Sequence, residues 1–78
     1  MNKNSVLPRL DYLLAFESTA VLGGFSAASK SLNISETAIS RKVKLLELHY
    51  KTSLFTRGHR SIQITPVGQR FLEDIQPV

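Results

Sequence analysis

Apolar residues recur at helical intervals over the first third of the chain. From Leu10 to Val21 they follow mostly at three- and four-residue spacing, which predicts a helix that opens near Pro8. Gly23-Gly24 is typical of its end. Ser26 is the expected N-cap of a short second helix that reaches Leu32, and Asn33 suits the tight turn after it.

A third helix is predicted from a stripe of apolar residues with a polar face beside it. Ser35 is its expected cap. The stripe, at i, i+4, i+7 and i+11, is expected to be buried, with Leu45 and Leu48 widening it, and it consists of Ile39, Val43, Leu46 and Tyr50. The opposite face is polar and basic, and its residues are Thr37, Ser40, Arg41 and Lys44.

The last part of the chain changes to a period of two. Residues 53–56 and 61–65 are predicted strands around a turn at 58–60, with Ile62 and Ile64 pointing inward. Thr65-Pro66 then caps and opens a fourth helix. The order is therefore a mainly α fold with a small β-hairpin: three helices, a hairpin and a fourth helix. Two helices joined by a tight turn, the second with a basic face, are typical of a helix-turn-helix, and the hairpin is then a wing.

Composition narrows the class of protein without deciding it. The chain has 78 residues and a formal net charge of +4, and this length has room for one domain. It contains no cysteine, which excludes a disulfide framework. Residues 35–60 hold six Lys or Arg and two Glu, which is the whole net charge. A concentrated positive charge attracts an anionic partner. Neither a membrane span nor a secretory signal is apparent, and we expect a cytoplasmic protein without cofactor.

The sequence resembles the N-terminal DNA-binding domain of LysR-type bacterial transcriptional regulators, in register from about Leu10 to Gly68. The residues that carry the resemblance are Leu13, Phe16, Gly23-Gly24-Phe25-Ser26-Ala27-Ala28, Leu32-Asn33-Ile34-Ser35, Ala38-Ile39-Ser40-Arg41, Leu46-Glu47, Leu54-Phe55-Thr56-Arg57, Arg60 and Thr65-Pro66-Val67-Gly68. The resemblance implies a winged helix-turn-helix that binds double-stranded DNA.

The expected domain organisation follows from this resemblance. Residues 1–7 are a flexible N-terminus and residues 8–65 are the winged helix-turn-helix, with the helix-turn-helix at about 25–44 and the wing at about 54–65. Residues 66–78 are the start of a dimerisation linker helix, in which the resemblance implies a dimer contact through Phe71, Leu72 and Ile75. Two copies would then read an inverted-repeat operator in successive major grooves.

Three departures from the family pattern are visible. Lys51 stands where the family usually has glycine. A lysine in the left-handed conformation costs about 1 kcal/mol more than a glycine, so a different local turn is expected there. Glu36-Thr37 stands where members often carry Gln-Pro, which predicts an unusual operator. The family continues into an effector-binding domain, whereas this sequence ends at Val78 and has no room for an effector pocket.

Four residues at the start of the third helix are expected to face base edges: Glu36, Thr37, Ser40 and Arg41. A carboxylate at Glu36 can accept from a cytosine amino group, and it also complements the helix dipole. The methyl group of Thr37 can touch a thymine methyl group, and Arg41 can reach guanine or phosphate.

A second set of residues is expected to contact phosphate or to enter the minor groove: Ser26, Lys30, Ser35, Lys42, Lys44, Arg57 and Arg60. Ser26 and Ser35 are also plain helix caps, and Arg57 can instead pair with Glu47. Arg60 is the expected minor-groove residue of the wing. His59 is more typical of a solvated turn.

Competing interpretations remain at this level. Ser40, Glu47 and His49 include nucleophile, acid and base, but nothing in the spacing unites them in one site, so we expect no enzyme. Two histidines without cysteine do not predict a metal site. The main alternative is a winged-helix protein-interaction module whose apolar fourth helix docks a partner. A third is the similar winged module of molybdate-responsive repressors, against which Leu54-Phe55-Thr56-Arg57 and Thr65-Pro66-Val67-Gly68 favour the LysR type.

Overall fold

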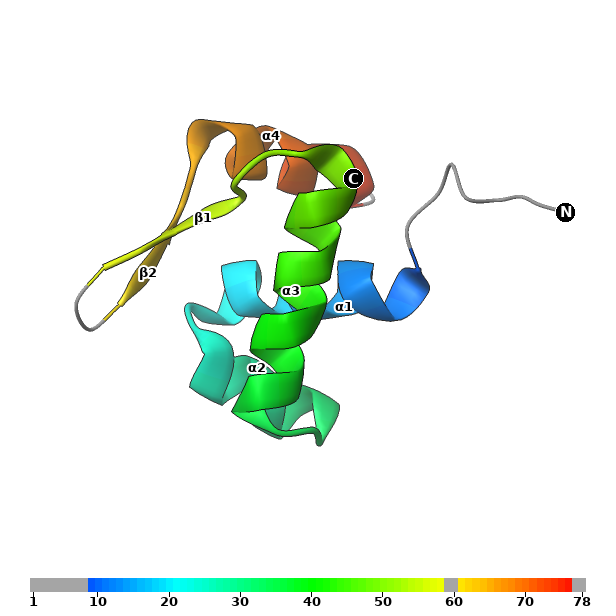
Figure 1. Ribbon diagram of the computed structural model, residues 1–78. Helices are drawn as coiled ribbons and strands as arrows, with labels where there is room; N and C mark the ends of the chain where they lie inside the picture. Colours follow the sequence, from blue (N-terminus) through cyan, green and yellow to red (C-terminus); the bar gives the residue numbers. More distant parts are fainter. Residues whose placement is uncertain (1–8, 59–60, 77–78) are drawn as a thin grey trace, which may run out of the picture.

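The computed structural model describes residues 9–58 and 61–76. It contains α1 (Leu10–Leu22), α2 (Phe25–Leu32), α3 (Glu36–Tyr50), β1 (Phe55–Arg57), β2 (Ile62–Ile64) and α4 (Pro66–Ile75). In Figure 1 α3 stands in front of α1 and α2, the hairpin projects to one side, and α4 lies across the end opposite the start of α3. The mainly α winged helix-turn-helix predicted from the sequence is confirmed.

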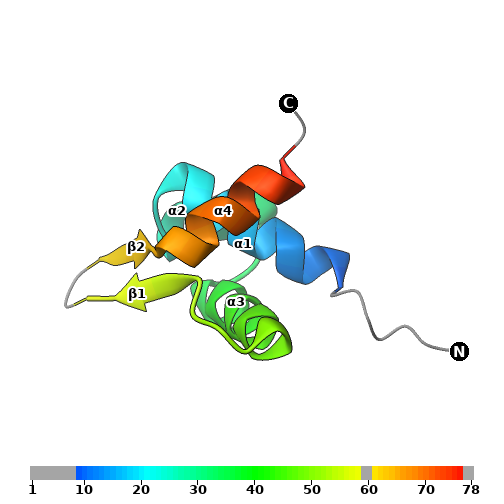
Figure 2. The ribbon, with the colours of Figure 1, turned by 90° about the horizontal axis from the view of Figure 1, so that it is seen from above.

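The core lies between α1 and α3 and extends under the hairpin and α4. Ile39, Val43 and Leu46 of α3 are fully buried, as the stripe predicts. The ring of Phe16 on α1 packs 5.3 Å from the ring of Phe55 and 5.3 Å from the ring of Phe71. The Phe16 side chain therefore joins α1, the wing and α4. Figure 2 shows α4 lying across α1, with the hairpin leading into the start of α4.

The carboxyl-terminal end of the α3 stripe departs from the prediction. Tyr50 is 42% exposed and Leu48 is 65% exposed. The reason is geometric: α3 continues beyond the core, so its last turn has little left to bury against. The Tyr50 ring lies 5.1 Å from the Phe71 ring of α4, and an edge-on contact joins it to His49.

The boundaries of the helices follow local chemistry in most places. The hydroxyl oxygens of Ser35 and Thr65 accept hydrogen bonds from the backbone N–H groups of Ala38 and Gly68, and both predicted N-caps are confirmed. The prediction for Ser26 is wrong: α2 begins at Phe25, and Gly24, two residues earlier than predicted, occupies the cap position without a side-chain hydrogen bond. Ser26 therefore lies inside the first turn.

Two turns use left-handed residues other than glycine. Asn33, with φ 59°, ends α2 as the sequence predicts. Lys51, with φ 57°, ends α3, and the N–H of Thr52 donates to the Glu47 carbonyl oxygen at 3.1 Å. This closure satisfies a free carbonyl at the end of the helix. The lysine thus retains the turn that glycine would make there, rather than the different turn expected from the sequence, at an expected cost of about 1 kcal/mol.

The hairpin is antiparallel, with Phe55 opposite Ile64 and Arg57 opposite Ile62. Its first strand begins later than residues 53–56, the range predicted from the sequence. The Gly58 N–H donates to the Ser61 carbonyl oxygen at 2.8 Å, which brings the two strands together before the tip. The tip residues His59 and Arg60, including the predicted minor-groove arginine, lie outside the described residues, as does the predicted flexible segment 1–7.

The start of α4 is fastened to the segment before β1. The hydroxyl of Thr65 donates to the Ser53 carbonyl oxygen at 2.9 Å, and the Thr65 N–H donates to the Leu54 carbonyl oxygen at 2.9 Å. Gly68 is buried against the same carbonyl, where a Cβ atom would overlap the Leu54 oxygen. Glycine is therefore required here by close approach of two backbones.

Candidate nucleic-acid interface

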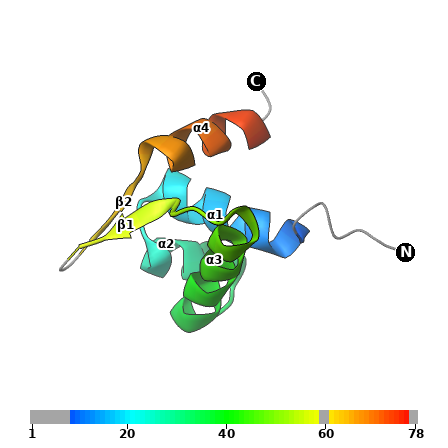
Figure 3. The ribbon, with the colours of Figure 1, turned by 45° about the horizontal axis from the view of Figure 1, so that its top comes forward.

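The first half of α3 presents a surface on which polar and charged residues lie beside apolar ones. All four predicted base-contact residues and Lys44 line a single depression on this face, together with two apolar residues, Phe25 and Leu45. In Figure 3 this end of α3 lies away from α4, with α2 packed behind it. The apolar residues Phe25 and Leu45 had no signal of their own in the sequence, because each also fits a core role.

Among residues 9–58 and 61–76, ion pairs divide the basic side chains into two groups. Lys42 donates to Asp11 at 2.8 Å, and Arg57 donates to Glu47 at 3.5 Å. Arg41 and Lys44 are exposed and make no ion pair with any described residue. Their charges are therefore directed to the solvent, where an anionic partner can reach them.

Lys42 ties α3 to α1 rather than standing free. Its ammonium group and the guanidinium of Arg9 both hold the Asp11 carboxylate. The hydrogen bond from Lys42, more than the one from Arg9, lowers the pKa of Asp11 to about 2, although partial burial opposes the shift. The sequence expectation that Lys42 contacts phosphate is thus weakened. Asp11 is 31 positions away, so no local pattern links the two residues.

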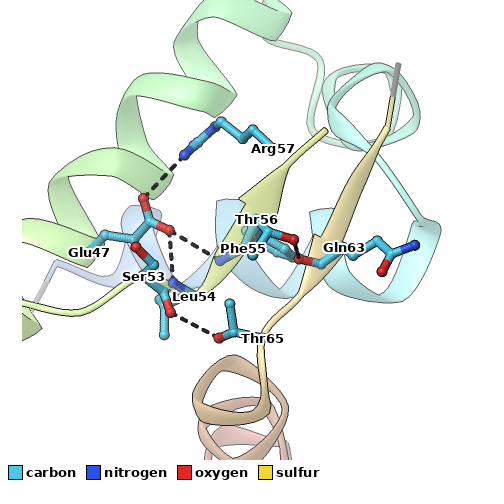
Figure 4. A network of polar contacts seen from close by, with 8 residues as sticks. All are labelled: Glu47, Ser53, Leu54, Phe55, Thr56, Arg57, Gln63 and Thr65. Carbon is cyan, nitrogen blue, oxygen red and sulfur yellow. Dashed lines mark hydrogen bonds and ion pairs between the residues drawn. The ribbon is translucent and has the colours of Figure 1, made fainter. Parts of the chain in front are cut away.

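Glu47 organises the base of the wing. The residue is 9% exposed, and its carboxylate accepts from the backbone N–H groups of Leu54 at 2.8 Å and Phe55 at 3.2 Å, besides Arg57 (Figure 4). The Arg57 guanidinium also lies 5.6 Å from the centre of the Phe25 ring. The alternative role for Arg57, pairing with Glu47, is confirmed, and this pairing sets the direction of its side chain.

A second hollow runs from the wing to the start of α2. It brings Ser26 and Arg57 together with Glu36, which, like Phe25, also lines the depression on α3. Lys30 lies apart, exposed in the last turn of α2, and the hydroxyl of Ser35 is engaged by its own helix. The phosphate candidates therefore surround the α3 face rather than forming one cluster.

Three apolar residues of α4 pack against the core of the chain, whereas Val67 is 52% exposed. Leu72 is 8% exposed, Phe71 packs on the rings of Phe16 and Tyr50, and Ile75 packs against the same core. Leu72 is buried and Phe71 is partly buried against the core of their own chain, and the dimer contact expected through these residues stays a prediction. Ile75 also borders a small hollow that includes the exposed Leu10 and Leu14.

Other kinds of site find little support in the described part of the chain. No group of three or more His, Asp or Glu side chains there is arranged to hold a metal ion. No helix in that part is long and apolar enough to cross a bilayer. The carboxylate of Glu47, an ingredient of the enzyme interpretation, is engaged by backbone N–H groups and Arg57.

Comparisons with known proteins agree on one family. The AhcY transcriptional activator HvrB of Rhodobacter capsulatus is 42% identical over 65 residues, which is 83% of this chain and 22% of that protein. A glycine cleavage system transcriptional activator homolog of Haemophilus influenzae is 36% identical over 72 residues, 92% of this chain and 24% of that protein. The chain therefore spans less than a quarter of the length of these two relatives.

Solved structures share the fold. Corynebacterium glutamicum OxyR in its oxidized form superimposes with a TM-score of 0.82 at 29% identity, covering 87% of this chain and 22% of that one. The CbnR DBD in complex with DNA gives a TM-score of 0.80 at 36% identity, covering 85% of this chain and 76% of that one. Residues 10–69 match the family described as "Bacterial regulatory helix-turn-helix protein, lysR family". The chain belongs to this LysR family and carries its helix-turn-helix domain.

Proposed function

We propose that this chain binds double-stranded DNA in a sequence-specific manner, as the DNA-reading part of a bacterial LysR-type transcription regulator in the cytoplasm. The observation that carries the proposal is the exposed face of α3, on which Glu36, Thr37, Ser40 and Arg41 line one depression with Lys44. A helix with such a face fits the major groove, where base edges present distinct donors and acceptors. The CbnR DBD, which shares this fold, is solved in complex with DNA.

The surrounding charges have a supporting role in this proposal. Lys44 and Lys30 are exposed and are assigned to phosphate contacts, as are Ser26 and Ser35 at the helix starts. Arg57 is directed by Glu47 and is assigned to the backbone beside the wing. The assignment of Arg60 to the minor groove rests on the sequence alone. These contacts position α3 and supply most of the affinity.

The proposed functional unit is a homodimer on an inverted repeat. Because Phe71 and Leu72 are engaged in their own core, the contact is assigned to the end of α4 and the start of α1. Leu10 and Leu14 are exposed there beside Ile75, around a hollow of about 150 Å³. Apolar side chains gathered on a surface are typical of a protein contact.

The alternative, a protein-interaction module, loses its main support. It required the apolar side of α4 to be available, and Leu72 and Phe71 are packed against the chain itself. A molybdate-repressor type is disfavoured by the family match over residues 10–69.

Selection from a random duplex library, followed by salt titration of the enriched site, tests the proposal. We expect an enriched half-site or inverted repeat, with log affinity falling by about 0.9 per neutralised phosphate for each unit of log salt. Binding without enrichment would reduce the proposal to non-specific affinity. Absence of binding at low salt would contradict it and favour the protein-interaction alternative.

A further inference from the structure

Glu36 and Arg41 lie on opposite edges of the exposed α3 face. Glu36 also lines the hollow that contains Arg57, Gly58 and Ser61, so it marks the edge nearest the wing. Arg41 also lines a hollow with Arg9 and Asp11, so it marks the edge nearest the start of α1. Both residues line the depression between these edges. Across the exposed α3 face, Glu36 therefore lies on the side of the wing and Arg41 on the side of α1.

Both side chains are available to a ligand. Glu36 and Arg41 are exposed, and neither forms an ion pair or side-chain hydrogen bond with another residue in the described ranges. This sets Glu36 apart from Glu47, whose carboxylate is held by three donors. The backbone of α3 fixes the Cα positions of Glu36 and Arg41, while their charged groups face the solvent.

The chemistry of base edges distinguishes the two. A carboxylate only accepts hydrogen bonds, and in the major groove cytosine presents a donor without an adjacent acceptor. A guanidinium only donates, and guanine presents two acceptors that match its fork. The two residues are five positions apart, about 7.5 Å along the α3 axis, and with α3 lying along the groove this length spans about two base steps of 3.4 Å.

We infer that Glu36 and Arg41 together set the polarity of the half-site. The half-site carries a cytosine on the side of the wing, read by Glu36, and a guanine about two base steps away on the side of α1, read by Arg41. This inference rests on the proposed function and deepens it, because it names base identities and their order.

The main proposed effect of Glu36 is to weaken binding to DNA sites that present no hydrogen-bond donor to its carboxylate. A carboxylate near phosphates is repelled, and opposite any base that lacks a donor it has nothing to offset that repulsion. Cytosine alone supplies a donor without an acceptor beside it. Replacing the carboxylate with an amide should therefore raise affinity for DNA in general while changing which base is preferred at one position.

The test is selection from a random duplex library with the 78-residue chain and its Glu36→Gln variant. We expect the variant to change one position from cytosine to adenine, because a glutamine amide pairs with adenine N6 and N7. For the unaltered chain we expect about tenfold discrimination of cytosine over thymine at that position. Glu73→Gln on α4 removes the same charge from an exposed site outside the α3 depression and is the matched control, expected to leave base preference unchanged.

Polarity is measured separately with Arg41→Gln and with footprinting. We expect Arg41→Gln to lose guanine preference about two base steps from the cytosine, and we expect the minor-groove protection due to the wing to flank the cytosine side. Unchanged preferences in Glu36→Gln, or protection on the guanine side, would overturn the inference and leave DNA binding intact. If the unaltered chain enriches no site at all, the proposed function itself fails.

Discussion

Glu36 and Glu47 stand about three turns apart on the same helix, in opposite surroundings. Glu36 is exposed at the first turn of α3, whereas Glu47 is buried near the end and accepts hydrogen bonds from β1 and Arg57. The basic residues divide the same way: Arg41 and Lys44 face solvent, and Lys42 and Arg57 are paired within the chain. Identical residue types thus serve the fold or the surface according to whether another element passes close by.

The largest expected effect comes from removing the buried acid. Glu47→Ala leaves the N–H groups of Leu54 and Phe55 and the Arg57 guanidinium without their acceptor, and we expect a loss of about 3 kcal/mol in the free energy of unfolding. Urea denaturation measures it. Glu47→Gln retains an acceptor oxygen and should lose less, and Glu36→Ala should cost below about 1 kcal/mol. Equal losses of unfolding free energy in Glu47→Ala and Glu36→Ala would contradict the contrast between the buried and the exposed glutamate.

Arg41→Ala is the corresponding change on the exposed face. We expect cognate DNA binding to weaken by about 1–3 kcal/mol, because a bidentate base contact is lost. The melting temperature should stay close to that of the unaltered chain, since Arg41 makes no ion pair within the described ranges. Titration of labelled duplex and a thermal melt measure the two quantities. Unchanged affinity and site preference would refute the base contact.

Lys44 and Lys42 sharpen the division between free and paired cations. Lys44→Ala should lower the log–log salt slope of DNA binding by about 0.9, because one phosphate contact is removed. Lys42→Ala should change the slope less, since its ammonium group lies 2.8 Å from Asp11. Salt titrations of both variants on one duplex give the comparison, and a larger slope change at Lys42 would reverse the assignment.

The smallest effect is the acid dependence of the Asp11 pair. The pKa of Asp11 is lowered from 3.8 to about 2 in the folded chain, so the stabilisation is complete above about pH 4 and is lost as pH falls through 2. Because the Asp11 side chain is 36% exposed, we expect only about 0.5 kcal/mol. Denaturation of the unaltered chain and Asp11→Asn between pH 6 and 2 should show their difference in stability shrinking. A constant difference would exclude the pair as its cause.

Local patterns were enough to predict much of the fold. The burial of Ile39, Val43 and Leu46 follows from helical spacing, and the caps at Ser35 and Thr65 follow from side-chain chemistry within three residues. Such features depend on neighbours in sequence, so the sequence contains the information for them.

What sequence reasoning missed depends on distant contacts. The late start of β1 is associated with Glu47 and Thr65, which bind the segment at Ser53 and Leu54 from outside it. The bond between Lys42 and Asp11 could not be predicted, because the two residues are 31 positions apart. In the candidate site, spacing placed Arg41 on the polar face of the third helix and the start of that helix indicated Glu36, but their order relative to the wing required the fold.

The close approach at Gly68 has a mechanical consequence. Because Gly68 of α4 lies directly against the Leu54 carbonyl and Thr65 is bonded to the same segment, we expect α4 and the hairpin to move together. A change in the direction of α4 is therefore expected to alter the position of the wing relative to α3.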